Sequence, residues 1–488
     1  MIGATTPQLT SAQAAMLAEL APVLGPKGIV TDAATIAPWL QDWRKRWQGA
    51  SPAILTPANT AEVAAIVAAA ARHRVPLVAQ GGNSSMVGGA TPPADGSALI
   101  LSLRRLDRIR SIDAEAGLSV VEAGVVLQTF NDAALTVGRR FPLTLGARGS
   151  ATIGGLVSTN AGGTQVLRFG TMRGLVAGVE AVLADGSIYD GLAALKKDNR
   201  GYDLDHLLVG AEGTLGIVTA ATLRLAPAVA ARGVAWAGVS DPQTALALLR
   251  SFQRDTDTIE SFEIMPAATL DAALAHVSGS RAPLQGRHRW HLLIEATAAT
   301  DDAEAPAAML ERLLGAALAG GLVEDATIAV SEAQAEAFWR LRDSLSDAER
   351  ARGPAVQFDI AVPVATMPAF MQQAASAAEH RFPGTDASGF GHLGDGNIHF
   401  HVRAPEGVDR DRWYAEDAPV ITRFVHDLVD AAGGTISAEH GIGQMKRDEL
   451  ARIASPARMM ALMAIKQAMD PLGILNPGKL LAPPARGQ

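Results

Sequence analysis

The chain has 488 residues, which is too long for one ordinary domain of about 100–200 residues. Its 42 Lys and Arg against 50 Asp and Glu give a formal net charge of −8, and no basic run indicates nucleic-acid binding. Cysteine is absent, which excludes disulfides, iron–sulfur clusters, thiolate zinc sites and cofactors linked through a thiol.

The hydropathy pattern predicts a protein without a membrane span. The longest apolar stretches, such as 63–71, fall far short of the about 18 residues that a transmembrane helix needs. The first residues, MIGATTPQLTSAQ, show no basic segment followed by an apolar one, so we expect no secretory signal and a cytoplasmic protein.

The first half of the chain predicts short helices and strands around glycine-rich loops. Residues 1–50 are predicted as helix and loop, and Thr60 is predicted to cap a helix that runs to Arg74. Apolar runs bounded by turn residues predict strands at 76–79, 99–103 and 118–122. Glycine-rich segments at 80–89, 146–163 and 209–219 each lie beside a strand. Their spacing has two explanations that fit it equally well. Either one extended ligand lies along the backbone of all three segments, or the segments are three unrelated turn regions.

After Pro227 the pattern changes. Predicted strands at 233–239, 259–264 and 290–296 alternate with predicted helices at 242–253, 266–277 and 302–318. This alternation is typical of a separate α+β domain. From about Ala415 the pattern is helical again, and it ends in DPLGILNPGK.

Gly389–Gly394 fits the dinucleotide motif G-x-G-x-x-G, but the residues that follow it alternate with period two instead of opening a helix. We therefore predict a β-hairpin with Asp395-Gly396 as a two-residue turn. This register places His392 opposite His399, and two imidazoles about 5 Å apart can share a metal ion. His401 falls on the same face. The alternative is a set of ordinary strand histidines bonded to backbone, but three of the chain's 11 histidines within ten residues favour a site.

A metal held by two histidines commonly takes a carboxylate as well. Glu439, in the glycine-flanked segment 433–443, is the best candidate for this carboxylate. Without the neighbouring histidines, the simpler interpretation of Glu439 would be a solvent-exposed side chain. His440 supplies an imidazole suited to act as a general base. A metallohydrolase that activates water is the alternative from another class, but its helical H-E-x-x-H motif is absent and it leaves the glycine-rich segments unexplained.

Several long motifs occur in a fixed order over roughly residues 40–480: QGGNSSMVGG, LGARGSATIGGLVSTNAGG, KKDNRGYDLDHLLVGAEGTLGIVT, GHLGDGNIHFHV, SAEHGIG and DPLGILNP. Together they resemble the FAD-linked D-2-hydroxy acid dehydrogenases of the vanillyl-alcohol oxidase superfamily, nearest to the D-2-hydroxyglutarate dehydrogenases. The resemblance implies an α+β fold in three parts. These are a vanillyl-alcohol-oxidase-type (PCMH-type) FAD-binding domain over 1–226 with its core at about 48–226, a substrate-binding cap domain with an antiparallel sheet over 227–414, and a helical segment, 415–488, that packs back on the FAD domain.

The same resemblance assigns FAD to the glycine-rich segments. The first loop would surround the pyrophosphate with backbone N–H groups, as in other anion-binding nests. Since the chain has no cysteine, and no histidine between His73 and His206, we expect the FAD to be bound non-covalently. The residues expected to bind it are Gln80, Gly81, Gly82, Asn83, Ser84, Ser85, Gly88, Pro142, Gly146, Ser150, Gly154, Asn160, Gly162, Glu212, Gly213, Ile217 and Asn476.

The resemblance also implies that His392, His399 and Glu439 hold a divalent metal, zinc more than manganese. A D-2-hydroxy acid would chelate this ion, His440 would take the hydroxyl proton, and hydride would pass from C2 to flavin N5. Arg342 and, four residues later on one helix face, Ser346 would bind the substrate carboxylate. Without the resemblance, Arg342 would be assigned to a surface ion pair.

Three positions depart from the hydroxyglutarate pattern. Gln357 stands where the family has Lys, His401 where it has Asn, and Ser346 where Thr is commoner. We expect these side chains to contact the substrate. Because the missing lysine would favour a second carboxylate, D-lactate, D-malate and bulkier 2-hydroxy acids remain open beside D-2-hydroxyglutarate.

Two other readings stay within flavin proteins. One is a subunit of the D-lactate dehydrogenase or glycolate oxidase type, and the other is a non-catalytic flavin-binding subunit, which would not need the metal and base residues. An enzyme would pass electrons to an external acceptor, an electron-transfer flavoprotein, a quinone or a cytochrome, because a chain without cysteine carries no iron–sulfur relay. A homodimer is compatible with the sequence.

Overall fold

The computed structural model describes residues 7–300 and 304–482. These residues form two compact units. The first unit consists of the described residues up to Gly162, Thr171–Pro227, and the described residues from Glu439 onward. The second consists of Gly163–Gly170 and Ala228–Ala438. It therefore extends past residue 414, where the sequence suggested the end of the cap domain.

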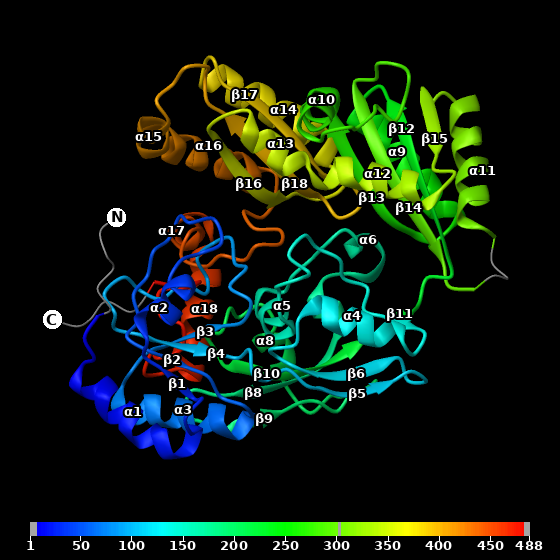
Figure 1. Ribbon diagram of the computed structural model, residues 1–488. Helices are drawn as coiled ribbons and strands as arrows, with labels where there is room; N and C mark the ends of the chain where they lie inside the picture. Colours follow the sequence, from blue (N-terminus) through cyan, green and yellow to red (C-terminus); the bar gives the residue numbers. More distant parts are fainter. Residues whose placement is uncertain (1–6, 301–303, 483–488) are drawn as a thin grey trace. The chain divides into compact units, whose positions relative to one another are not determined.

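The strands of the first unit form two larger sheets and one pair (Figure 1). One sheet has the order β1-β2-β4-β3, with β4 parallel to both β2 and β3. The other is antiparallel with the order β5-β6-β10-β8-β9. The strands are β1 (Ile29–Val30), β2 (Ile54–Leu55), β3 (Leu77–Gln80), β4 (Leu99–Ser102), β5 (Ile109–Asp113), β6 (Leu118–Glu122), β7 (Arg139–Arg140), β8 (Val176–Val182), β9 (Ile188–Asp190), β10 (Ile217–Arg224) and β11 (Ala226–Pro227).

Helices α1 and α3 of the first unit pack together, and their apolar side chains join those of β3 and β4 in one core. The helix predicted from Thr60 begins there, but its cap is Asn59, whose side chain accepts the N–H of Glu62. The helices of this unit are α1 (Ser11–Leu24), α2 (Ala33–Ile36), η1 (Ala37–Trp39), α3 (Thr60–His73), α4 (Leu127–Leu135), α5 (Ile153–Thr159), α7 (Met172–Leu175), α8 (Leu204–Leu208), α17 (Arg447–Ile453) and α18 (Pro456–Met469).

The second unit is built on one seven-stranded sheet, in the order β15-β12-β14-β13-β17-β18-β16. Every neighbouring pair is antiparallel, as the resemblance predicted for the substrate domain. The strands are β12 (Ala231–Val239), β13 (Ile259–Pro266), β14 (Trp290–Ala298), β15 (Asp325–Ile328), β16 (Ala355–Ala361), β17 (Asp386–His392) and β18 (Asn397–Arg403).

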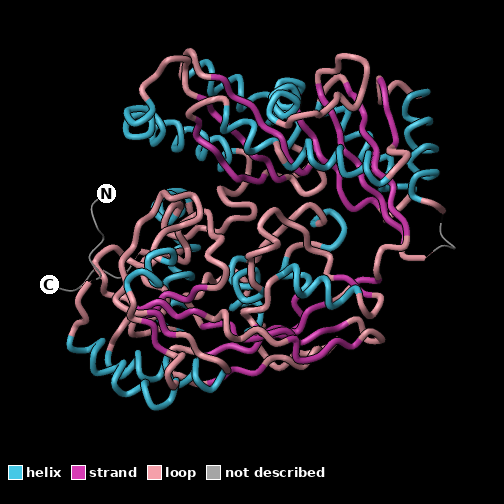
Figure 2. The backbone as a smooth tube through the Cα atoms, in the orientation of Figure 1, coloured by secondary structure: helices cyan, strands magenta, loops and turns pink. Residues whose placement is uncertain are grey.

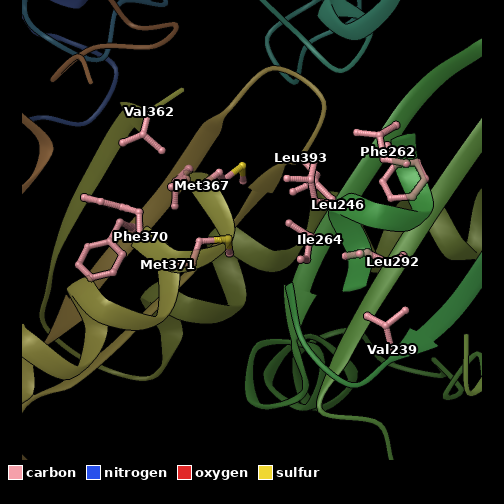
Figure 3. Close-up of a cluster of buried hydrophobic side chains, with 14 of the residues drawn as sticks. Val239, Leu246, Phe262, Ile264, Leu292, Val362, Met367, Phe370, Met371 and Leu393 are labelled. Atoms are coloured by element: carbon pink, nitrogen blue, oxygen red, sulfur yellow. The ribbon is translucent and has the colours of Figure 1, made fainter. Parts of the chain in front are cut away.

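Helices cover both faces of this sheet. On one face, α9, α11, α14 and α16 pack against a large apolar core, part of which Figure 3 shows. On the other face, α10, α12 and α13 bury a smaller cluster around Trp236 and Phe390. The helices are α6 (Val166–Phe169), α9 (Pro242–Asp255), α10 (Ala267–His276), α11 (Pro306–Ala319), α12 (Glu332–Asp343), α13 (Leu345–Ala351), α14 (Met367–Arg381), α15 (Arg410–Arg412), the π-helix η2 (Trp413–Asp417) and α16 (Ala418–Ala431).

The position of α16 explains why the second unit extends to Ala438. Its buried side chains, among them Ile421, Val425 and Val429, belong to the same core as the sheet. Burial of apolar surface is the main favourable term in packing such a helix, so these residues stay with the second unit.

The glycine-rich segment 81–98, between β3 and β4, forms neither helix nor strand. Figure 2 shows the strands and helices of the first unit joined by many such loops. None of the helices in the described residues combines the length and the apolar character that crossing a membrane requires.

Candidate active site

A β-hairpin in the second unit carries the three predicted strand histidines. β17 and β18 pair around residues 393–396, which confirms the hairpin and excludes the dinucleotide-binding turn. The predicted register is wrong, however: His392 lies opposite Asn397, and His399 lies opposite Phe390. The turn thus has four residues instead of two.

The neighbouring strands account for the longer turn. The N–H of Leu393 donates to the carbonyl of Phe262 on β13, at 2.9 Å, and the N–H of Val362 donates to the carbonyl of Gly396, at 3.1 Å. Leu393 also lies in the large core that Figure 3 shows. Because the register changes by two residues and strand side chains alternate with period two, His392 and His399 still share a face. Their ring centroids are 5.5 Å apart.

The same face carries polar side chains from four neighbouring strands. Glu263 on β13 lies opposite His392, Asp359 on β16 lies opposite His399, and Gln357 on β16 lies opposite His401. The structure therefore brings Gln357 and His401 together, beside the two histidines expected to bind metal. His392, His401 and Asp359 are all buried.

Glu263 joins His392 to Arg342. Its Oε1 lies 2.8 Å from Nδ1 of His392, and its Oε2 accepts from Nε of Arg342 at 2.8 Å. Burial alone would raise the pKa of Glu263, but the charges of Arg342 and His392 outweigh burial and lower it. Burial alone would lower the pKa of His392, but the Glu263 carboxylate raises it to about 9.

Glu439 and His440 follow directly on Ala438, the last residue of the second unit. Thr435 pairs with Ala361, and the N–H of Ala438 donates to the carbonyl of Asp359 at 3.3 Å, so the chain runs along β16 up to this point. One ligand atom each from His392, His399 and Glu439 can be chosen so that all three lie within 4.8 Å of one another. Two imidazoles and a carboxylate form a donor set that suits zinc, so these residues fit a divalent metal.

Arg342 and Ser346 do not lie on one continuous helix, contrary to the expectation. α12 ends at Asp343 and α13 begins at Leu345, with Ser344 as the cap between them. Ser344 serves both helices, since its N–H donates to the carbonyl of Arg340 and its carbonyl accepts the N–H of Ala348. Of the predicted pair, Arg342 donates to Glu263 and lies 3.2 Å from His392, on the sheet face that carries the histidines.

In the first unit, the loop after β3 packs against the segment 150–152. A Cβ atom on Gly81 would lie 2.1 Å from Oγ1 of Thr152, and one on Gly82 would lie 1.8 Å from the carbonyl of Ser150. Only glycine fits at either position. The N–H groups of residues 82–84 donate no hydrogen bond to any part of the described chain, so they are available to a bound anion, as the N–H groups of an anion-binding nest are.

Asn476 connects this loop to the third glycine-rich segment. Its side-chain amide donates to the carbonyls of Gly89, at 3.0 Å, and Glu212, at 2.7 Å. Oε1 of Gln80, Oγ1 of Thr152 and Oδ1 of Asn476 are buried and have no hydrogen-bond partner within residues 7–300 and 304–482. Such oxygens need a partner from a bound molecule or water, so these residues fit a polar cofactor.

Strained backbone marks the same residues. Asn83, Asn160, Glu212 and Asn476 all have positive φ, between 42° and 53°. Non-glycine residues in this conformation are uncommon and concentrate at ligand sites. Gly154 is equally constrained, because a Cβ there would lie 2.6 Å from that of Ala123.

The remaining predicted FAD residues have different surroundings. Ile217 is buried in the core shared by α1, α3, β3 and β4, so only its backbone is available to a ligand. Gly146 has open space around it. The others lie in loops or at loop ends: Ser84, Ser85, Gly88, Pro142, Ser150, Gly162 and Gly213.

Glu212 uses its carboxylate inside the first unit. Its two oxygens accept the N–H groups of Ile442 and Gly443, each at 2.7 Å. Burial raises the pKa of this carboxyl, while these N–H groups and the buried Lys446 and Lys479 act in the opposite direction. The side chain therefore anchors the segment that follows His440.

Two family models match the chain in succession. Residues 51–191 match an FAD binding domain, and residues 229–480 match the C-terminal domain of FAD linked oxidases. The chain is 35% identical over 462 residues to D-2-hydroxyglutarate dehydrogenase, mitochondrial, of Arabidopsis thaliana, covering 94% of this chain and 80% of that protein. The chain belongs to the FAD-linked D-2-hydroxy acid dehydrogenase family.

A bacterial relative matches over nearly its whole length. D-2-hydroxyglutarate dehydrogenase of Stutzerimonas stutzeri (strain A1501) is 34% identical over 472 residues, covering 96% of this dehydrogenase and 99% of the relative. These matches confirm the expectation that this chain is an FAD-linked D-2-hydroxy acid dehydrogenase, an enzyme that oxidises a small hydroxy acid.

A solved structure of p-cresol methylhydroxylase with substrate bound shares the fold. Its TM-score is 0.72 at 17% identity, covering 98% of this dehydrogenase and 99% of that chain. This confirms the predicted α+β fold with a vanillyl-alcohol-oxidase-type FAD-binding domain.

Two residues on the histidine face were not anticipated from the sequence. Glu263 lies 129 positions before His392, and no local pattern links them. Asp359 could have been predicted from the sequence. Along β16, Gln357, Asp359 and Ala361 alternate with the apolar residues of the strand. Reading this period-two pattern would have placed Gln357 and Asp359 on one face.

Proposed function

We propose that this dehydrogenase oxidises D-2-hydroxyglutarate to the 2-oxo acid, with FAD and a divalent metal. The observation that carries the proposal is the grouping of His392, His399 and Glu439, with His440 next in the chain. The relatives named D-2-hydroxyglutarate dehydrogenase support the choice of acid.

The metal, zinc in preference to manganese, would be held by His392, His399 and Glu439. When bound, such an ion polarises a hydroxyl oxygen and so makes its proton easier to remove. His440 is the base that takes this proton, since a neutral imidazole accepts one near neutral pH. FAD, when bound, accepts the hydride from C2 of the acid.

Arg342 binds the C1 carboxylate of the substrate. Its guanidinium is oriented by Glu263, and arginine can bind a carboxylate through two parallel hydrogen bonds. Ser346, His401 and Gln357 are proposed to contact the rest of the substrate. Because Gln357 is neutral, D-malate and D-lactate are the acids to compare with D-2-hydroxyglutarate.

FAD is proposed to bind the first unit non-covalently, through the glycine-rich residues assigned to it above. The nest at 82–84, the buried unpartnered oxygens and the absence of cysteine support this assignment. Electrons then leave to an external flavoprotein, quinone or cytochrome, because the chain carries no cysteine for an iron–sulfur relay.

The proposal is tested by anaerobic titration of the flavin absorbance with D- and L-2-hydroxyglutarate, D-malate and D-lactate. Each titration is repeated after dialysis against a chelator, and again after zinc is restored. We expect D-2-hydroxyglutarate to bleach the flavin, its L enantiomer to leave it oxidised, and the chelator to prevent bleaching reversibly. Bleaching by D-lactate alone would show that D-lactate, not D-2-hydroxyglutarate, is the substrate. Bleaching that the chelator does not prevent would overturn the proposed metal dependence.

A further inference from the structure

Glu263 lies between two residues to which the proposed function gives different tasks. Its side chain is 1% exposed, and β13 places it directly opposite His392. One carboxylate oxygen lies on Nδ1 of His392, at 2.8 Å, and the other accepts from Nε and Nη2 of Arg342, at 2.8 and 2.7 Å. Both oxygens of a fully buried carboxylate are thus engaged.

The contact with His392 determines which nitrogen of the ring remains for a metal. A carboxylate accepts but does not donate, so Nδ1 of His392 carries the proton of this hydrogen bond. The lone pair of the neutral ring is then on Nε2. A carboxylate on the far nitrogen orients a metal-binding histidine and strengthens it as a ligand.

The contact with Arg342 fixes the plane of the guanidinium. Nε and Nη2 lie on one edge of this planar group, and a carboxylate bound along that edge restricts rotation about the last bonds of the side chain. Nη2 also lies 3.2 Å from Nε2 of His392, so the two groups are adjacent. Any movement of Glu263 would therefore displace both.

We propose that Glu263 is a positioning residue that sets the tautomer of the metal ligand His392 and, through its second oxygen, the orientation of the substrate-binding Arg342. This inference rests on the proposed function, because it assumes that His392 binds a metal and that Arg342 binds the acid. A purely structural ion pair is the competing explanation.

The same strand offers a matched control for that explanation. Glu260 is also fully buried on β13 and also bound to an arginine, with Oε1 2.8 Å from Nη1 of Arg168 and 2.5 Å from Oγ1 of Thr297. Replacing Glu260 by Gln removes a buried carboxylate of the same kind without touching Glu263. Loss of a buried ion pair as such should affect both variants alike.

The test compares Glu263→Gln with Glu260→Gln and the unaltered holoenzyme. The zinc dissociation constant is measured by competition with a chromophoric chelator, and the ligand geometry by the visible spectrum of the cobalt-substituted protein. Loss of such outer partners weakens metal binding about 10–100-fold, so we expect this for Glu263→Gln and less than a twofold change for Glu260→Gln. The cobalt spectrum should change only in Glu263→Gln.

Kinetics at saturating zinc separate the two tasks of Glu263. We expect Glu263→Gln to raise KM for the D-2-hydroxy acid even when the metal is fully bound, because Arg342 loses its orientation. Glu263→Asp, which keeps the charge on a shorter side chain, should give an intermediate zinc affinity. If the Gln variant does not fold, the Asp variant still tests whether Glu263 positions His392. Folding of each variant is checked by its FAD content and circular dichroism.

Equal zinc affinity in the unaltered protein, Glu263→Gln and Glu263→Asp would overturn the inference while leaving the metal site intact. Equal weakening by Glu263→Gln and Glu260→Gln would reduce Glu263 to a structural ion pair. Failure of the unaltered protein to bind zinc, cobalt or manganese would instead overturn the proposed metal site, and this inference with it.

Discussion

Glu212, whose φ is +53°, accepts the backbone N–H of Gly443 through its carboxylate at 2.7 Å. The second oxygen holds the N–H of Ile442 in the same way. Together they anchor the segment after His440 inside the first unit.

Replacing Glu212 by Gln should lower the free energy of unfolding by about 1.5–3 kcal/mol. A hydrogen bond to a charged group contributes about 1.5–3 kcal/mol, and the amide nitrogen of Gln cannot accept an N–H. The free energy is measured by denaturant titration with circular dichroism. Glu115→Gln, at an exposed position, is the control. A Glu212→Gln protein as stable as the control would show that the carboxylate does not hold this segment.

Gly82→Ala should prevent FAD from binding. The added methyl group would lie 1.8 Å from the carbonyl of Ser150, so one of the two loops must move and the nest is lost. Gly149→Ala is the matched control, because no atom lies within 4 Å of its added methyl. FAD content is measured from the absorbance of the protein after gel filtration. Full FAD occupancy in Gly82→Ala would rule out this loop as the pyrophosphate site.

His392→Ala should abolish turnover and lower bound zinc, while FAD content stays unchanged. The reason is that His392 belongs to the second unit, whereas the residues expected to bind FAD all belong to the first. Metal is measured by mass spectrometry and FAD by absorbance on the same sample. Full activity of the variant after chelator treatment would contradict the metal assignment.

Arg342→Lys should lower kcat/KM by at least about 10-fold, mainly through KM. Lysine keeps a cation beside Glu263 but loses the planar pair of donors that binds a carboxylate. Steady-state rates with a dye acceptor give both constants. Arg340→Lys, at an exposed position on the same helix, should leave them unchanged. An unaltered KM in Arg342→Lys would mean that another residue binds the carboxylate.

His291 should make the stability of the protein pH-dependent. Burial, reinforced by nearby His288 and opposed by Asp271 and Glu324, lowers its pKa to about 4 from the usual 6.5. Between these values the unfolded chain binds a proton and the folded protein does not. The free energy of unfolding should therefore decrease as pH falls from 6.5 to 4, by up to about 3 kcal/mol.

Denaturant titrations across that pH range test this expectation. His291→Gln removes the titrating group but keeps an acceptor for the indole N–H of Trp236, which lies 3.2 Å from Nδ1 of His291. The variant should show a flatter pH profile. Identical profiles for the two proteins would assign the acid sensitivity to other groups.

Local patterns in the sequence were enough for most elements of the second unit. The strands expected at 233–239, 259–264 and 290–296 lie within β12, β13 and β14, and the period-two run after Gly396 is β18. Alternation and apolar runs predict strands well because each residue's environment depends on its immediate neighbours along the strand. The family was likewise recognisable from the order of its long motifs.

The turn of the hairpin shows where local patterns fail. Asp395-Gly396 favours a two-residue turn, yet hydrogen bonds from β13 and the segment after β16 hold a four-residue one. His392 and His399 still share a face, because a two-residue change of register keeps every side chain on its side of the sheet.

By itself, the sequence determined the fold class, the hairpin, the glycine-rich loops and the family of this dehydrogenase. Only the tertiary structure determined which strands are neighbours, and therefore that Glu263 lies against His392 and Arg342 and that Glu212 holds Gly443. These contacts join residues 79 to 231 positions apart. Pairing over such distances depends on how sheets and loops pack, and no periodicity within one segment encodes it.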